Sequence, residues 1–137
     1  MILLIMFIIC SCTDESAQHD FSISISNNTN ISLEIRCFSE HKLQLQKIIN
    51  QGDTFKICEY SSESFYGMAG CKLDSMVVDL NNSKGYIDIR LDNNQNTYRF
   101  LNGKSIFIQG MGFQNNGNNY EFLITQQDYE NAHELPD

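Results

Sequence analysis

Residues 21–37 read FSISISNNTNISLEIRC, and this stretch decides the fold class. Apolar residues from Phe21 to Ile25 alternate with serines, which is the period-two pattern of a strand with one buried face. Residues 27–30, NNTN, have the composition of a turn, and apolar residues then recur at every second position up to Cys37. We therefore expect two strands joined as a hairpin, with Cys37 on the core face.

Most of the remaining chain repeats this alternation, with breaks that are rich in Asn and Gly. Further strands are expected at residues 43–49, 54–60, 75–80, 86–91, 97–101, 104–109 and 120–125. Asn102-Gly103 has the composition of a two-residue hairpin turn between two of these strands. In the strand at 86–91, the pattern predicts that Ile87, Ile89 and Leu91 face inward.

About eight or nine short strands, without an amphipathic segment of helix length, predict an all-β fold. We expect a β-sandwich, immunoglobulin-like or transthyretin-like, of about eight antiparallel strands. A small β-barrel is the alternative. Thr125 and Asp128 have the spacing of a capping box, which predicts a short C-terminal helical turn within residues 126–132.

The chain begins MILLIMFIICSC, with an unbroken apolar run from Met1 to Ile9. This run is much shorter than the roughly 20 residues that cross a bilayer, and it has the length of a secretory signal. Ile9 and Ser11 stand three and one residues before Cys12, which resembles the lipobox of bacterial lipoproteins, whose mature cysteine is lipidated. No Lys or Arg precedes Cys12, although such signals normally open with positive charge. The alternative is a short N-terminal strand with two incidental cysteines.

Acidic residues follow the lipobox at Asp14 and Glu15, and the Asn-rich β domain closes with ITQQDYENA at 124–132. In these features the chain resembles the small lipoproteins that Bacteroidota export. That resemblance implies a lipid anchor on Cys12 in the outer membrane, on its periplasmic or surface face, and no known activity. The expected layout is a signal peptide at 1–11, a lipidated tether at 12–20, a sandwich domain at 21–132 and a frayed tail at 133–137.

Charge and cysteine content narrow the function further. The formal charge is −8, which repels phosphate backbones and argues against nucleic-acid binding. An exported domain meets an oxidising compartment, in which one disulfide is possible among Cys37, Cys58 and Cys71. We expect Cys58 to pair with Cys71, because the alternation turns Cys58 away from the core and Cys71 lies in a loop. The alternative is that all three thiols are reduced and packed.

Motifs for catalysis or metal binding are weak. Asp92, Asn94 and Asn96 imitate the opening of a calcium loop, but Thr97 replaces the required glycine, so a polar turn is the better interpretation. The sequence has no GxSxG motif and no Cys/His spacing suited to zinc. We therefore expect no catalytic residue, no cofactor and no metal ligand.

The longest irregular stretch is SSESFYGMAGCKLD at residues 61–74. Its aromatic residues Phe65 and Tyr66 are candidates for contact with a partner, since long loops on a β scaffold often carry binding function. An ordinary crossover whose rings cap the core is the alternative. The sequence therefore favours a membrane-anchored, non-enzymatic module that binds a glycan or a protein. A lipid-anchored inhibitor or immunity protein acting on a hydrolase is the second hypothesis, and a hydrolase with paired carboxylates is the third.

Overall fold

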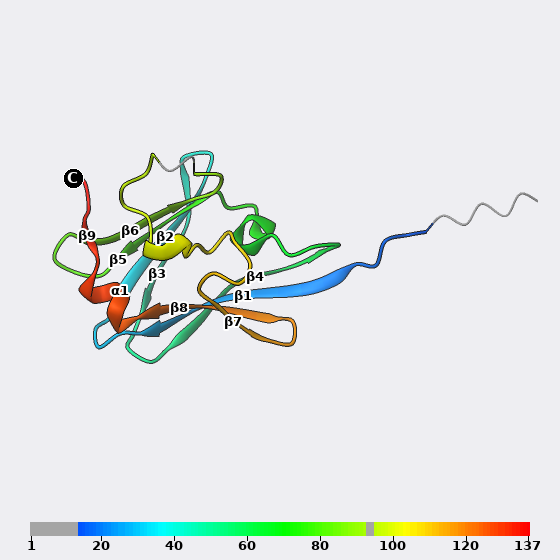
Figure 1. The fold of residues 1–137 in the computed structure, drawn as a ribbon, viewed down its shortest axis with the longest axis horizontal. Coiled ribbons are helices and arrows are strands. Elements are labelled where there is room, and N and C mark those ends of the chain that lie inside the picture. The colour runs from blue at the N-terminus through cyan, green and yellow to red at the C-terminus, as the bar shows by residue number, and fades with distance from the viewer. Residues whose placement is uncertain (1–13, 93–94) are drawn as a thin grey trace, which may run out of the picture.

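The computed structural model describes residues 14–92 and 95–137, so the expected signal at 1–11, Cys12 and Asn94 lie outside the described residues. Two sheets form two packed layers (Figure 1). The first sheet has the order β4-β1-β8-β7 and the second has the order β3-β2-β5-β6-β9. The strands are β1 His19–Asn28, β2 Leu33–Ser39, β3 Lys42–Ile49, β4 Thr54–Ser62, β5 Ser75–Asp79, β6 Lys84–Ile89, β7 Phe113–Asn116, β8 Asn119–Thr125 and β9 His133–Glu134. The expected all-β sandwich is confirmed, and the barrel alternative is wrong, because each sheet of the described residues ends in two edge strands.

The predicted hairpin between the first two strands is wrong. β1 pairs antiparallel with β4 and parallel with β8, whereas β2 pairs with β3 and β5 in the other sheet. Between them the buried Asn27 side chain donates to the carbonyl oxygens of Ile31, at 2.7 Å, and Ile49, at 2.9 Å. These bonds hold the chain as it crosses from one layer to the other. The parallel β1–β8 pair also departs from the expected all-antiparallel arrangement.

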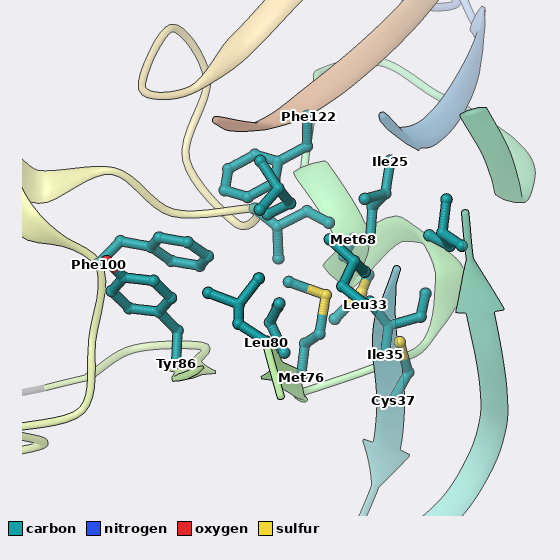
Figure 2. Close-up of a cluster of buried hydrophobic side chains, with 14 of the residues drawn as sticks. Ile25, Leu33, Ile35, Cys37, Met68, Met76, Leu80, Tyr86, Phe100 and Phe122 are labelled. Atoms are coloured by element: carbon teal, nitrogen blue, oxygen red, sulfur yellow. The ribbon is translucent and has the colours of Figure 1, made fainter. Parts of the chain in front are cut away.

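The larger of two core clusters joins the two layers. Ile25 and Phe122 reach it from the first sheet, and Leu33 and Ile35 reach it from the second (Figure 2). Cys37 lies in the same cluster with no exposed surface, as the alternation predicts. Burial raises the pKa of its thiol to about 12, so this cysteine is an uncharged packing residue.

The prediction that Cys58 faces away from the core is wrong, because β4 contains a bulge. The register pairs Ile23 with Cys58 and then Ser24 with Lys56, which leaves Ile57 as the extra residue. A bulge inserts one residue and reverses the faces that follow it. Cys58 therefore lies on the same side of the sheet as the buried Ile23.

The predicted facing of β6 is also wrong. Tyr86 and Asp88 point inward and are buried, whereas Ile89 is 41% exposed and Leu91, just beyond the strand, is 83% exposed. The inward Tyr86 ring stacks on Phe100 at 4.1 Å between centroids, and the two rings lie face to face in Figure 2. Tyr86 and Asp88 can face inward because both of their polar groups have hydrogen-bond partners there. The Tyr86 hydroxyl donates to the Asp128 carbonyl oxygen, and the Asp88 carboxylate accepts the Ile106 backbone N–H.

The segment between β6 and β7 contains no strand among its described residues. The strands expected at 97–101 and 104–109 are replaced by irregular chain around the 3₁₀ turn η2, Leu101–Gly103. Asn102 and Gly103 do adopt positive φ angles of 58° and 72°, but the chain on either side does not pair as a hairpin. A second 3₁₀ turn, η1, spans Gly67–Cys71 within the loop after β4.

The ends of the domain differ from the expected limits. β1 begins at His19, inside the expected tether, and the chain leaves the sandwich along the direction of β1 (Figure 1). Helix α1, Gln126–Glu130, has the predicted capping box between Thr125 and Asp128. The expected frayed tail is wrong for its first residues, because β9 pairs with Lys84 and Gly85 of β6.

Candidate functional site

One end of the sandwich is hollowed by a pocket of about 410 Å³ between η1 and the irregular segment that follows β6. This volume lies within the range of pockets that hold small ligands. Aromatic and charged side chains line its walls, among them Tyr66, Asp88, Arg90, Asp92, Lys104 and Phe107. We call this hollow the end pocket.

The wall formed by η1 is fixed by a disulfide. Cys58 of β4 and Cys71 at the end of η1 are bonded, and this is the pair expected from the sequence. The bridge closes a loop of 13 residues in which both candidate aromatic residues lie. Tyr60, also in β4, accepts a hydrogen bond from the backbone N–H of Tyr66 at 3.0 Å. The loop is therefore held to the first sheet on both sides of Tyr66.

The two candidate aromatic residues have different roles. Phe65 is half-buried, stacks on Tyr120 at 4.2 Å and makes an edge contact with Phe113 at 5.3 Å between centroids. Both residues line the end pocket, and Tyr66 is the more exposed, at 51%. Phe65 thus anchors the loop and forms part of the pocket wall, and Tyr66 is the ring that is more accessible to a ligand.

Gly67 allows η1 to lie directly against the opposite wall. Its φ angle is +55°, and a Cβ at this position would lie 2.3 Å from the carbonyl oxygen of Ile106. That oxygen accepts the backbone N–H of Met68 at 2.9 Å. Only glycine combines this left-handed conformation with so close an approach.

The opposite wall is held by Asp88. Its carboxylate accepts the Ser105 hydroxyl at 2.9 Å and the Ile106 backbone N–H at 2.7 Å. Burial raises the pKa of Asp88 to about 6, the two hydrogen bonds oppose this increase, and the charge of Asp92 adds to it. Asp88 therefore fastens the irregular segment to β6.

Two charged side chains of the end pocket have unused capacity for hydrogen bonds or ion pairs among the described residues. Asp92 Oδ1 accepts the backbone N–H of Asn96 at 3.4 Å, whereas the buried Oδ2 has no hydrogen-bond partner within residues 14–92 and 95–137. The exposed Arg90 forms no ion pair within that same part of the chain. The pocket thus offers an acceptor and a cationic donor beside the Tyr66 ring.

Lys104 also lines the end pocket, but its charge is already paired within the protein. Its ammonium group lies 2.6 Å from Asp128 Oδ2, is bonded to the carbonyl oxygen of Leu123 and stands 5.0 Å from the Phe122 ring centroid. Both side chains of this ion pair are only 15% exposed. The pair joins the irregular segment to the start of α1.

The sequence indicated Phe65, Tyr66 and the disulfide, but it did not indicate the charged residues of the end pocket. Asp92 was considered only as part of an imitation calcium loop, and Asp88, Arg90 and Ser105 carried no recognised motif. A polar residue at an alternating position, Asp88 between Ile87 and Ile89, was the one signal that could have drawn attention to this strand. No three acidic, His or Cys side chains among the described residues are grouped to hold a metal ion.

Comparisons with known proteins identified no relative of this chain. No family model matches the sequence, and no curated protein or solved structure is significantly similar to it. Within the described residues, no helix has the length and apolar character needed to cross a membrane.

Proposed function

We propose that this protein is a lipid-anchored, non-enzymatic module that binds a glycan in the end pocket. The observation that carries the proposal is the combination of an exposed aromatic ring, Tyr66, with an unpartnered acceptor, Asp92 Oδ2, in one hollow. The anchor is the lipid on Cys12, argued from the lipobox at residues 9–12.

Sugar chemistry fits the groups that the pocket leaves available. A pyranose ring presents an apolar face that packs on an aromatic side chain, and hydroxyl groups that both donate and accept hydrogen bonds. Asp92 can accept from such a hydroxyl, and Arg90 can donate to another. A buried acceptor without a partner costs about 1–3 kcal/mol, so a hydroxyl that satisfies Asp92 Oδ2 recovers free energy on binding.

The carboxylates of the pocket support binding rather than hydrolysis. Retaining and inverting glycosidases use two carboxyl groups that both face the scissile bond. Here Asp88 is occupied by Ser105 and Ile106, which leaves Asp92 as the carboxylate with a free oxygen. We therefore favour a module that recognises a glycan without cleaving it.

A glycan array followed by calorimetric titration tests the proposal. We expect a bound oligosaccharide whose affinity falls about tenfold or more in Tyr66→Ala and in Asp92→Asn, because each removes one of the two recognition elements. Tyr98→Ala, a half-buried tyrosine outside the pocket lining, is the control and should bind normally. Affinity that is unchanged in both pocket variants, or release of sugar products during the titration, would contradict the proposal.

A further inference from the structure

The two sheets present very different outer surfaces. On the first sheet, β1 places Ser22, Ser24 and Ser26 on the outer side, in register with Glu59 and Lys56 of β4. Ser22 and Ser26 are buried, and Lys56 and Glu59 are exposed, so this outer face is polar. The outer face of the second sheet instead carries apolar side chains on each of its four longer strands, together with Arg36, Glu34 and Asp79.

The register of the second sheet aligns these apolar residues across four strands. Phe38 of β2 lies opposite Leu43 of β3 on one side and Ser75 of β5 on the other, and Ser75 lies opposite Ile89 of β6. In the neighbouring row, Val77 lies opposite Ile87. We call this surface the apolar face, and its members are Phe38, Leu43, Ile48, Val77, Ile87 and Ile89.

Water reaches this surface in the structure. Leu43 is 49% exposed, Ile48 is 60% exposed, and Phe38, Val77 and Ile87 are half-buried. The facing of β6 contributes directly, because this strand buries Asp88 and turns two isoleucines outward. Five residues of the apolar face adjoin one another across the strands, and Ile48 lies apart from them beside Glu34. A cluster of exposed apolar side chains of this kind on an exported domain marks a contact with another molecule.

Negative charge borders the apolar face at both ends. At one end the Asp74 carboxylate accepts the Ser75 hydroxyl at 3.1 Å and the Glu40 backbone N–H at 2.7 Å. At the other end Glu34 and Asp79 lie opposite each other on β2 and β5. Arg36 lies between the ends, with its Nε atom 3.6 Å from Glu34. Asp74 and Asp79 form no ion pair within residues 14–92 and 95–137.

This charge pattern selects the occupant. A second copy stacked on the face would bring carboxylates against carboxylates, on chains that each carry a formal charge of −8. A partner with an apolar strip bordered by Lys or Arg meets complementary charge at both ends. We propose that the apolar face docks a basic protein through such a strip. This site is independent of the end pocket, with which it shares only Ile89 at the rim.

The probe for this surface is a synthetic peptide that alternates lysine with valine and phenylalanine, compared with a counterpart in which glutamate replaces lysine. The isotope-labelled chain is titrated with each peptide, and amide shifts are mapped by NMR. We expect the lysine peptide to bind more tightly, to shift amides of β2, β3, β5 and β6, and to weaken as salt is added, because the bordering charges are screened.

Matched variants separate docking at this face from general attraction to an acidic chain. The double substitution Leu43→Ser/Ile48→Ser keeps the charge and should weaken the lysine peptide about tenfold, because two exposed apolar contacts are lost. Leu101→Ser removes a leucine of nearly the same exposure, 47%, outside the face and should leave binding unchanged. Equal binding of the two peptides, equal loss in both variants, or a stable dimer in sedimentation would each overturn the proposal. None of these results bears on glycan binding in the end pocket, because Leu43 and Ile48 do not line it.

Discussion

At the scale of single residues, Asp88 shows how one side chain can reverse a strand. Strict alternation would place Ile87 and Ile89 in the core, yet the structure buries Asp88 and exposes Ile89. The exchange is stable because the carboxylate supplies acceptors that Ser105 and Ile106 would otherwise lack. A buried polar group whose hydrogen bonds are satisfied fixes the conformation of the loop that it contacts, here the segment at Ser105 and Ile106, more specifically than apolar packing does.

The raised pKa of Asp88 predicts a specific dependence of stability on pH. The folded pKa of about 6 exceeds the ordinary value of 3.8, so between these values the folded state binds more protons than the unfolded state. This contribution to stability is fully present below about pH 4 and is lost as the pH rises through 6, by up to roughly 3 kcal/mol. Asp88→Asn cannot ionise, and wild type should therefore lose stability relative to this variant between pH 4 and 7.

Urea unfolding of both proteins across this range checks the prediction, because the difference between them cancels the other titrating groups. The free energy of unfolding of Asp88→Asn minus that of wild type should increase with pH. A difference that stays constant from pH 4 to 7, or that decreases, would contradict the burial of an ionisable Asp88.

At the scale of elements, the bulge in β4 and the 3₁₀ turn η1 act together. The extra residue Ile57 turns Cys58 to the inner side of the sheet, where it reaches Cys71 at a Cα separation of 5.8 Å. Without the bulge, strict alternation would point Cys58 outward, away from the turn that it now fastens. The disulfide therefore depends on a local irregularity that the alternating pattern does not encode.

Removal of this disulfide should loosen the wall of the end pocket as well as the fold. We expect Cys58→Ser/Cys71→Ser to lower the free energy of unfolding by about 3 kcal/mol, because an unfolded chain without a cross-link across 13 residues gains conformational entropy. Binding at Tyr66 should weaken in the same variant. Denaturant unfolding with and without a reducing agent measures the effect.

The reducing agent supplies an internal control for that experiment. It should destabilise the wild type by a similar amount and leave the double variant unchanged, since Cys37 is a free thiol in the core. An equal response of both proteins to the reducing agent would show that the bridge is not the source of the stability.

At the scale of the whole molecule, alternation predicts layers but not their connections. The strands near residues 21–26, 43–49, 54–60 and 120–125 form as expected, and those at 21–26 and 120–125 bury the apolar side that the alternation predicts. The alternating pattern does not indicate which strands pair with each other. The sequence therefore did not reveal that β1 and β2 belong to different sheets. The end pocket could be predicted only at Phe65 and Tyr66, since Asp88, Arg90 and Asp92 acquire their roles when distant segments meet.

The arrangement of the domain leads to a prediction for the proposed anchor. The described chain has its first strand at His19, and the core clusters contain no residue before Phe21. A change at Cys12 should therefore act on location alone. We expect Cys12→Ala to shift the protein from the membrane fraction to the soluble fraction, because the lipid is then lost, while the thermal unfolding midpoint of the domain stays within about 1 °C of wild type.

Cys10→Ala is the matched control and should remain in the membrane fraction, since the lipobox assigns the lipid to Cys12. Retention of Cys12→Ala in the membrane would show that another part of the chain holds it there, and a lowered unfolding midpoint would show that the N-terminal segment contributes to the fold.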